Sequence, residues 1–116
     1  LVQASTLLGD RIHDGAVYVG MNGPRYETPS EIRMVKQLGG DVVGMTAASE
    51  AIALAENGVP YGCLAVVTNM GAGIVPGFLS HEEVVDVMED KGPRILELLF
   101  MAVELGLAST PAPDEA

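Results

Sequence analysis

Short apolar runs alternate with helical patterns along most of this chain. The runs at residues 16–21, 41–45 and 61–69 are rich in β-branched side chains, which predicts strands. The segments between them, residues 29–38 and 47–57, carry the spacing or the composition of helices. This βαβαβ order predicts an α/β fold in which helices flank a parallel or mixed sheet.

Two capping boxes, in which a Thr or Ser is followed three residues later by Glu, mark where helices begin. Thr28 and Glu31 form the first box, with Pro29 at the first helical position. Ser80 and Glu83 form the second box, which predicts the beginning of a final helix.

The final helix is expected to be interrupted. Gly92 and Pro93 predict a kink or break, after which an apolar helical pattern resumes over residues 95–105. Residues 109–116 are polar and contain two prolines, so we expect a disordered tail there.

The composition limits the classes of partner. The chain has 116 residues, 48% of them hydrophobic, which is enough for one core in a single modest domain at residues 1–108. Sixteen acidic residues against six basic ones give a net charge of -10, and this charge repels nucleic acid. We therefore expect no nucleic acid partner, although a small phosphate can still bind locally through backbone amides.

The single cysteine bears on the compartment. Cys63 cannot form an internal disulfide, and its apolar neighbours predict a buried strand thiol, which favours a reducing, cytoplasmic location. No apolar run reaches the roughly 18 residues that a membrane helix requires, so we expect no membrane partner. Because Leu1 is not an initiator methionine, we expect the natural N-terminus to lie elsewhere.

Candidate functional residues follow each predicted strand. In a parallel sheet, functional residues gather at the carboxyl ends of the strands. Three places meet this rule: the turn after Met21, the pair Met45 and Thr46, and the pair Thr68 and Asn69.

The GPRYE segment at residues 23–27 places an aromatic ring beside a carboxylate. Tyr26 offers a face for stacking, and Glu27 accepts hydrogen bonds from ring N–H donors, so the pair suits a flat nitrogenous ring. The alternative is a turn in which Glu27 only complements the dipole of the following helix, and the segment alone favours this simpler interpretation.

The other candidates also have two interpretations. Thr46 can present its hydroxyl and a helix N-terminal amide to an anion, or it can be an N-cap. Met45 can pack against a ligand or belong to the core. The Asn69 amide can bind a purine at its 6-carbonyl and N7, or it can hold the following loop. His81 can bind a sugar hydroxyl or be a solvated first-turn residue.

The sequence has no cysteine pair, no His/Asp/Glu cluster at metal spacing, no Gly-x-Ser-x-Gly elbow and no P-loop. We therefore expect neither a metal site nor nucleoside triphosphate chemistry.

Four motifs occur in order: GPRYETPSEIRM, GGDVVGMTAASEA, VVTNMGAGI and SHEEV. Together they resemble the C-terminal part of the trimeric purine nucleoside phosphorylases, over residues 15–105. The resemblance implies part of a three-layer, phosphorylase/hydrolase-like α/β domain. It also implies a homotrimeric enzyme that cleaves a purine nucleoside with inorganic phosphate, releasing the base and ribose 1-phosphate, with no cofactor.

The resemblance implies that four residues bind the purine and that a fifth contacts the substrate. Tyr26 would stack on the base, Glu27 would bind its ring, and Val43 would line the base pocket. Asn69 would be the catalytic residue that stabilises the negative charge building at N7 and O6 of the departing purine, and Thr68 beside it would contact the substrate.

Three further residues would bind the sugar and phosphate. Met45 would pack against the ribose, and His81 would lie near the ribose 5'-hydroxyl. Thr46 would bind phosphate, in a position where the family often has Ser. The implied mechanism is dissociative: the sugar develops oxocarbenium character while phosphate attacks from the opposite face.

The chain also departs from the family. The family's chains are much longer, and their N-terminal part carries a glycine-rich serine loop, an arginine and a histidine that hold phosphate. We therefore expect the isolated chain to bind phosphate poorly. An inactive nucleoside-binding or oligomerising fragment is the alternative from another class.

Within the family, the alternative is a methylthioadenosine or methylthioinosine phosphorylase, which shares the GPRYET and GMT motifs. Asn69 favours a 6-oxopurine, because adenine-using relatives tend to have Asp there. His81 favours a free 5'-hydroxyl over a methylthio group.

Overall fold

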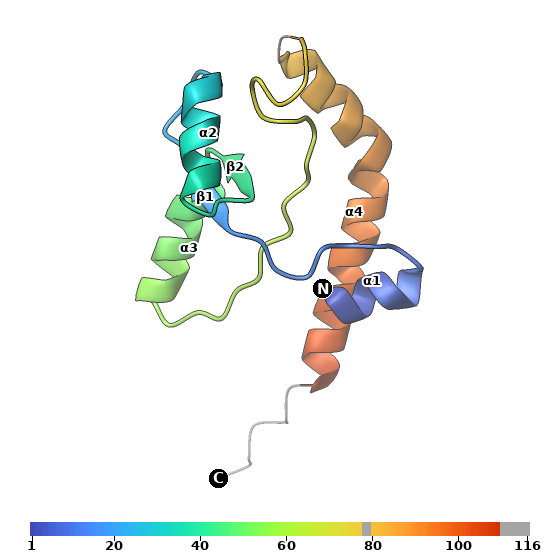
Figure 1. Cartoon of the computed structure of the whole chain (residues 1–116). Coiled ribbons are helices and arrows are strands. Elements are labelled where there is room, and N and C mark those ends of the chain that lie inside the picture. The colour runs from blue at the N-terminus through green and yellow to red at the C-terminus, as the bar shows by residue number, and fades with distance from the viewer. Residues whose placement is uncertain (78–79, 110–116) are drawn as a thin grey trace. The chain divides into compact units, whose positions relative to one another are not determined.

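The computed structural model describes residues 1–77 and 80–109 of the chain, in two compact units (Figure 1). One unit comprises Leu1–Asp14 and Val87–Ala116, and the other comprises Gly15–Asp86. All the candidate site residues belong to the second unit. The tail predicted at residues 109–116 lies outside the described residues except for Ser109, which is the last residue of a helix.

Two short parallel strands form the sheet of the second unit. β1 (Tyr18–Gly20) pairs with β2 (Val42–Gly44), with Val19 opposite Val43. The Met21 N–H donates to the Gly44 carbonyl at 2.8 Å, so the chain leaves both strands at the same edge. The strands predicted at residues 16–21 and 41–45 are confirmed in shorter form.

The helix α2 (Pro29–Gln37) begins at the predicted capping box. The Glu31 N–H donates to the Thr28 hydroxyl at 3.3 Å, and the Thr28 N–H donates to the Glu31 carboxylate at 2.7 Å. Ile32 and Val35 are buried, and they are the buried hydrophobic residues of this unit within its described part. The predicted helix is confirmed, and its apolar face forms the centre of a small core.

The helix α3 (Ala47–Glu56) follows β2 and approaches β1. A Cβ added to Gly20 would lie 2.6 Å from the Ala48 Cβ, so the strand can approach this helix only through a residue without a side chain. The helix ends at Asn57, and Gly58 follows with a φ of 66°. The helix predicted at residues 47–57 is therefore confirmed.

The strand predicted at residues 61–69 is wrong. This segment is assigned no strand and no backbone ladder, and Cys63, predicted as buried, is exposed. A run that is apolar on both faces becomes a strand only where a neighbouring strand pairs with it and helices cover it. Here the sheet of the described residues contains only β1 and β2, so the residue types alone do not produce a strand.

Of the kink or break predicted in the final helix, the break is also wrong. α4 (His81–Ser109) continues through Pro93, and the Glu83 N–H donates to the Ser80 hydroxyl at 3.2 Å ahead of its first turn. A proline removes one hydrogen bond from a helix, at a cost of about 3 kcal/mol, without forbidding its continuation. Apolar helical periodicity on both sides of Pro93 favours one helix here.

The first unit contains a helix that carries few sequence signals. α1 (Val2–Leu8) ends at Gly9, which has a φ of 74°. Arg94 links α4 to the end of α1. Its Nε donates to Asp10 Oδ2 at 2.7 Å, and its guanidinium also donates to the Leu8 carbonyl. Ala4 of α1 and Leu98 of α4 are the buried hydrophobic residues of this unit within its described part.

Candidate functional site

Tyr26 and Glu27 lie in the irregular segment between β1 and α2. Only 8% of Glu27 is exposed, yet no hydrogen bond or ion pair involves its carboxylate within the described part of the chain. Its oxygens retain some contact with solvent, because no fully buried side-chain oxygen or nitrogen there lacks a partner. The Tyr26 side chain is partly open, with 37% of the residue exposed. A largely buried carboxylate without a protein donor is an acceptor that a ligand with N–H groups can satisfy.

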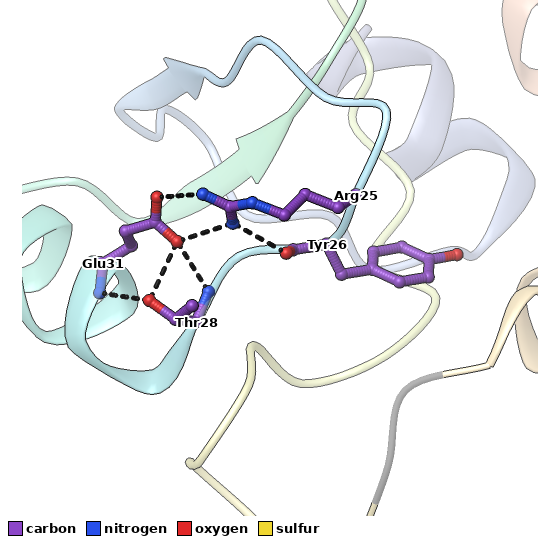
Figure 2. Close-up of polar contacts among 4 residues, drawn as sticks. All are labelled: Arg25, Tyr26, Thr28 and Glu31. Atoms are coloured by element: carbon purple, nitrogen blue, oxygen red, sulfur yellow. Dashed lines mark hydrogen bonds and ion pairs between the residues drawn. The ribbon is translucent and has the colours of Figure 1, made fainter.

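Arg25 and Glu31 hold this segment from the side of α2 (Figure 2). The guanidinium binds the carboxylate in a fork, with Nη1 to Oε2 and Nη2 to Oε1 both at 2.8 Å. Nη1 also donates to the Tyr26 carbonyl at 3.0 Å, and the Thr28 hydroxyl donates to Glu31 Oε2 at 2.8 Å. Figure 2 shows the Tyr26 ring pointing away from this pair, so the ring is not used by the cluster.

These donors lower the pKa of the Glu31 carboxyl. The hydrogen bond from Arg25, followed by those from the Thr28 backbone and hydroxyl, lowers the pKa of Glu31 from 4.5 to about 2. The same contact raises the pKa of Arg25, first through its hydrogen bond to Glu31 and then through the charge of Glu31. The pair is therefore ionised throughout the physiological range.

The low pKa of Glu31 predicts a pH window for stability. A carboxyl whose pKa is lower in the folded state stabilises the fold above its unfolded pKa, and this contribution is lost as the pH falls through the folded value. We therefore expect the difference in Tm between wild type and Glu31→Gln to be full at neutral pH and to shrink between about pH 4.5 and pH 2. The exposed Glu56, changed to Gln, is the control for the loss of one surface carboxylate. A Glu31→Gln difference that stays constant down to pH 2 would contradict the low pKa.

Met45 lies against the turn that precedes Tyr26. A Cβ added to Gly23 would lie 2.7 Å from the Met45 sulfur, and Gly23 has a φ of 59°. Met45 is 39% exposed, so it is not a core residue, and the structure brings it to the GPRYE segment. This contact joins the carboxyl end of β2 to the segment that follows β1.

Thr46 stands at the N-cap position of α3 without acting as a cap. Its side chain makes no capping hydrogen bond to the helix, and its φ and ψ of -122° and -53° are not those of a usual N-cap. The simpler interpretation of Thr46 as a cap is therefore wrong. The hydroxyl and the first amides of α3 both remain available to an anion.

Thr68 and Asn69 are joined to each other. Asn69 Nδ2 donates to Thr68 Oγ1 at 3.2 Å in a partly buried position. The loop that follows lies against α2, because Cβ atoms on Gly71 and Gly73 would lie 3.1 Å from Ile32 and 2.7 Å from Pro29. Asn69 thus lies two residues before a loop that contacts Pro29, the first residue of α2, and Pro29 is two residues after Glu27.

The contact between Gly73 and Pro29 predicts an unequal cost for two glycine substitutions. Gly73 and Gly58 both have positive φ, at 75° and 66°, but only Gly73 has a neighbour within 4 Å of an added Cβ. We expect Gly58→Ala to cost about 1–2 kcal/mol through its backbone. Gly73→Ala should cost about 2–4 kcal/mol, because overpacking adds to that strain. Urea unfolding of the two variants tests this, and equal costs would contradict the loop contact.

Val43 and His81 are the two remaining predicted site residues. Val43 is half-buried at the centre of β2, opposite Val19. His81 is the exposed first residue of α4, and no hydrogen bond or ion pair of the described residues connects it to the rest of the set. The described residues also hold no group of three or more His, Cys, Asp or Glu suited to a metal ion. No helix in that part of the chain is long and apolar enough to cross a membrane.

Arg25 is the residue that the sequence pattern misses. An arginine just before a capping box follows no spacing rule, and its partner Glu31 is already explained by the cap. The available signal is weak: opposite charges six residues apart, with a turn between them. Its contacts emerge only once the turn brings its side chain back over the beginning of α2 (Figure 2).

Comparison with known proteins identifies relatives over nearly the whole chain. A family model described as the phosphorylase superfamily matches residues 1–104. A probable 6-oxopurine nucleoside phosphorylase of Moorella thermoacetica is 48% identical over 89% of this chain and 40% of its own length. The 6-oxopurine nucleoside phosphorylase of Pyrococcus furiosus is 44% identical over 90% of this chain and 40% of its own.

A third relative carries a different name. A probable S-methyl-5'-thioinosine phosphorylase of Methanopyrus kandleri is 39% identical over 90% of this chain and 41% of its own length. The chain thus spans about 40% of the length of these relatives. Since the family model covers far more than half of the sequence, the chain belongs to the phosphorylase superfamily.

Proposed function

We propose that the whole protein catalyses the phosphorolysis of purine nucleosides with a preference for 6-oxopurines, and that this chain supplies the nucleoside-binding part of the site. The observation that carries the proposal is Glu27, a largely buried carboxylate with no protein donor, beside the partly open Tyr26. A purine has ring N–H groups for the carboxylate and a π-face for the tyrosine. Relatives named 6-oxopurine nucleoside phosphorylase support this substrate class.

In the proposed reaction the bond between the purine N9 and the ribose C1' breaks, and a phosphate oxygen forms a bond to C1'. The electron pair of the broken bond passes to the purine, where negative charge develops at N7 and O6. We assign the stabilisation of this charge to Asn69, whose amide can turn from Thr68 toward the base. Glu27 then holds the ring N–H groups, and Val43 lines the base pocket.

We assign the binding of the sugar and phosphate to residues that follow β2 and to the first residue of α4. Met45 is assigned to the ribose, and its partial exposure beside Gly23 supports this. Thr46 is assigned to phosphate, because neither its hydroxyl nor the first amides of α3 are used by a cap. His81 is assigned to the ribose 5'-hydroxyl. Phosphate is a co-substrate, and the reaction needs no cofactor.

A methylthioinosine phosphorylase is the second candidate. The relative of Methanopyrus kandleri carries that name and matches the chain at 39% identity. Hypoxanthine is the base in both inosine and methylthioinosine, so Asn69 serves either substrate. The two candidates differ only at the 5'-position, where His81 would meet a hydroxyl or a thioether.

The test is phosphate-dependent release of base from inosine, guanosine, methylthioinosine and methylthioadenosine by the whole protein. Faster release from inosine and guanosine supports the first candidate, and faster release from methylthioinosine supports the second. No release from any of the four would contradict both. The 116-residue chain alone, tested in parallel for inosine binding and turnover, separates a nucleoside-binding fragment from an enzyme.

A homotrimeric assembly in the cytoplasm, with a three-layer domain, completes the proposal. These features rest on the resemblance of the four sequence motifs to the trimeric purine nucleoside phosphorylases. The mass of the whole protein in solution, measured by light scattering, tests the trimer, and a monomer or a hexamer would contradict it.

A further inference from the structure

The Arg25 side chain closes a ring of hydrogen bonds around the segment that precedes α2. It reaches from the turn to Glu31, six residues ahead, through two bonds of 2.8 Å. Glu31 in turn accepts from the Thr28 backbone and hydroxyl, at 2.7 and 2.8 Å. Tyr26 and Glu27 therefore lie between two anchored positions, with Arg25 before them and Thr28 after them.

Arg25 also contacts the enclosed segment directly, because its Nη1 donates to the Tyr26 carbonyl at 3.0 Å. This carbonyl belongs to the peptide group that joins Tyr26 to Glu27, so the bond restrains the orientation of both residues. The guanidinium is a planar fork that can hold a carboxylate and a carbonyl in one plane, which an ammonium cannot do.

The pairing with Glu31 also governs the charge beside Glu27. Among the described residues, Arg25 makes an ion pair within 4 Å only with Glu31, so its guanidinium does not pair with Glu27. The charge of Glu27 reaches Arg25 only as a minor influence compared with that of Glu31. Glu27 thus remains an unpaired acceptor next to a cation that is already held elsewhere.

We propose that Arg25 is a positioning residue for purine recognition: clamped by Glu31, it fixes the peptide between Tyr26 and Glu27 and leaves the Glu27 carboxylate free for the ring N–H groups of the base. This inference rests on the proposed function for the identity of the ligand. Its structural part, the restraint of residues 25–31, stands on the contacts alone.

The experiment compares Arg25→Met, Arg25→Lys, Glu31→Gln and the double variant Arg25→Met/Glu31→Gln in the whole protein. Arg33→Met is the matched control, because Arg33 is an exposed arginine of α2 whose fork donates to Ser30 within the same helix at 2.7 Å. For each protein we would measure KM and kcat with varied inosine and with varied phosphate, together with hydrogen exchange of the Thr28 amide.

Arg25→Met is expected to lower kcat/KM for inosine by about 10- to 100-fold, chiefly through KM, while KM for phosphate changes by less than about twofold. Arg25→Lys should show most of the same loss in kcat/KM, because lysine keeps the charge but lacks the planar guanidinium. The double variant should lose less than the sum of the two single losses, since both changes break the contact between Arg25 and Glu31. The hydrogen exchange rate of the Thr28 amide should be about tenfold higher in Arg25→Met than in the wild type, and it should be unchanged in Arg33→Met.

Three results would overturn the inference: an Arg25→Met protein with the kinetics of Arg33→Met, an equal rise in KM for both substrates, or additive losses in the double variant. A merely structural role would lower the amount of active protein and leave both KM values unchanged. If the wild type releases no base at all, the proposed function fails, and the exchange of Thr28 still decides whether Arg25 restrains the segment.

Discussion

Replacing Asn69 with alanine is expected to lower kcat for inosine phosphorolysis by about 100- to 1,000-fold in the whole protein. The charge on the departing purine is largest in the transition state, so a donor aimed at N7 and O6 acts on kcat more than on binding. The Asn69 amide is partly buried and donates to the Thr68 hydroxyl at 3.2 Å. This bond to a side chain restrains the amide without using a backbone acceptor. Initial rates of hypoxanthine release at saturating phosphate measure the effect.

The control for this prediction is Asn57→Ala, at the C-cap of α3. Asn57 also donates through its side-chain amide, to the Ala53 carbonyl at 2.8 Å, but it lies at the far end of the helix from Thr46. We expect its kinetics to match the wild type. Asn69→Asp should in addition raise the relative rate with 6-aminopurine nucleosides, since a carboxylate can accept from a protonated N7. An Asn69→Ala protein within about threefold of wild type would contradict the catalytic role, because loss of such a donor costs far more.

Replacing Glu27 with glutamine is expected to lower kcat/KM for inosine by about 100-fold while leaving stability unchanged or raised. Glutamine has the same shape, but it lacks the charge, and its NH₂ group can face a position where the purine also has a donor. Glu27 makes no hydrogen bond to the described protein, and only 8% of it is exposed, so a neutral group is easier to bury there. Steady-state kinetics and thermal unfolding of the same samples measure both effects.

Glu56→Gln is the matched control, because Glu56 is an exposed carboxylate at the opposite end of α3 from the proposed phosphate site. Its kinetics should not change. The opposite pattern at Glu27, with lower stability and unaltered kinetics, would assign this carboxylate to the dipole of α2 and remove it from the base site.

The local signals in the sequence predicted the elements around the site well. The capping box of Thr28 and Glu31 located the beginning of α2, and Gly58 located the end of α3, because caps are decided by a few neighbouring residues. Residues 61–69 show the limit of this approach. Strand formation depends on a paired neighbour, and the sequence of the segment contains no information on whether that neighbour is present.

The contacts among the candidate site residues could be predicted from the sequence only in part. The rule for the ends of parallel strands directs attention to Met45 and to the turn after Met21, and the structure brings Met45 to Gly23. Asn69 follows no strand in the structure, so that rule does not explain its position. The roles of these residues stay predictions, as does that of His81. The bond from Arg25 to the Tyr26 carbonyl depends on the path of a turn, which no spacing of residue types specifies.

The double use of Glu31 has a consequence for redesign. The Glu31 carboxylate both caps the beginning of α2 and binds Arg25. A substitution at this position therefore disturbs the folding of α2 and the orientation of Tyr26 and Glu27 together. Libraries that seek a new base preference should therefore randomise positions 26 and 27 and keep 25, 28 and 31 constant. Variants selected in this way would differ in what they bind while sharing one scaffold, which makes their affinities directly comparable.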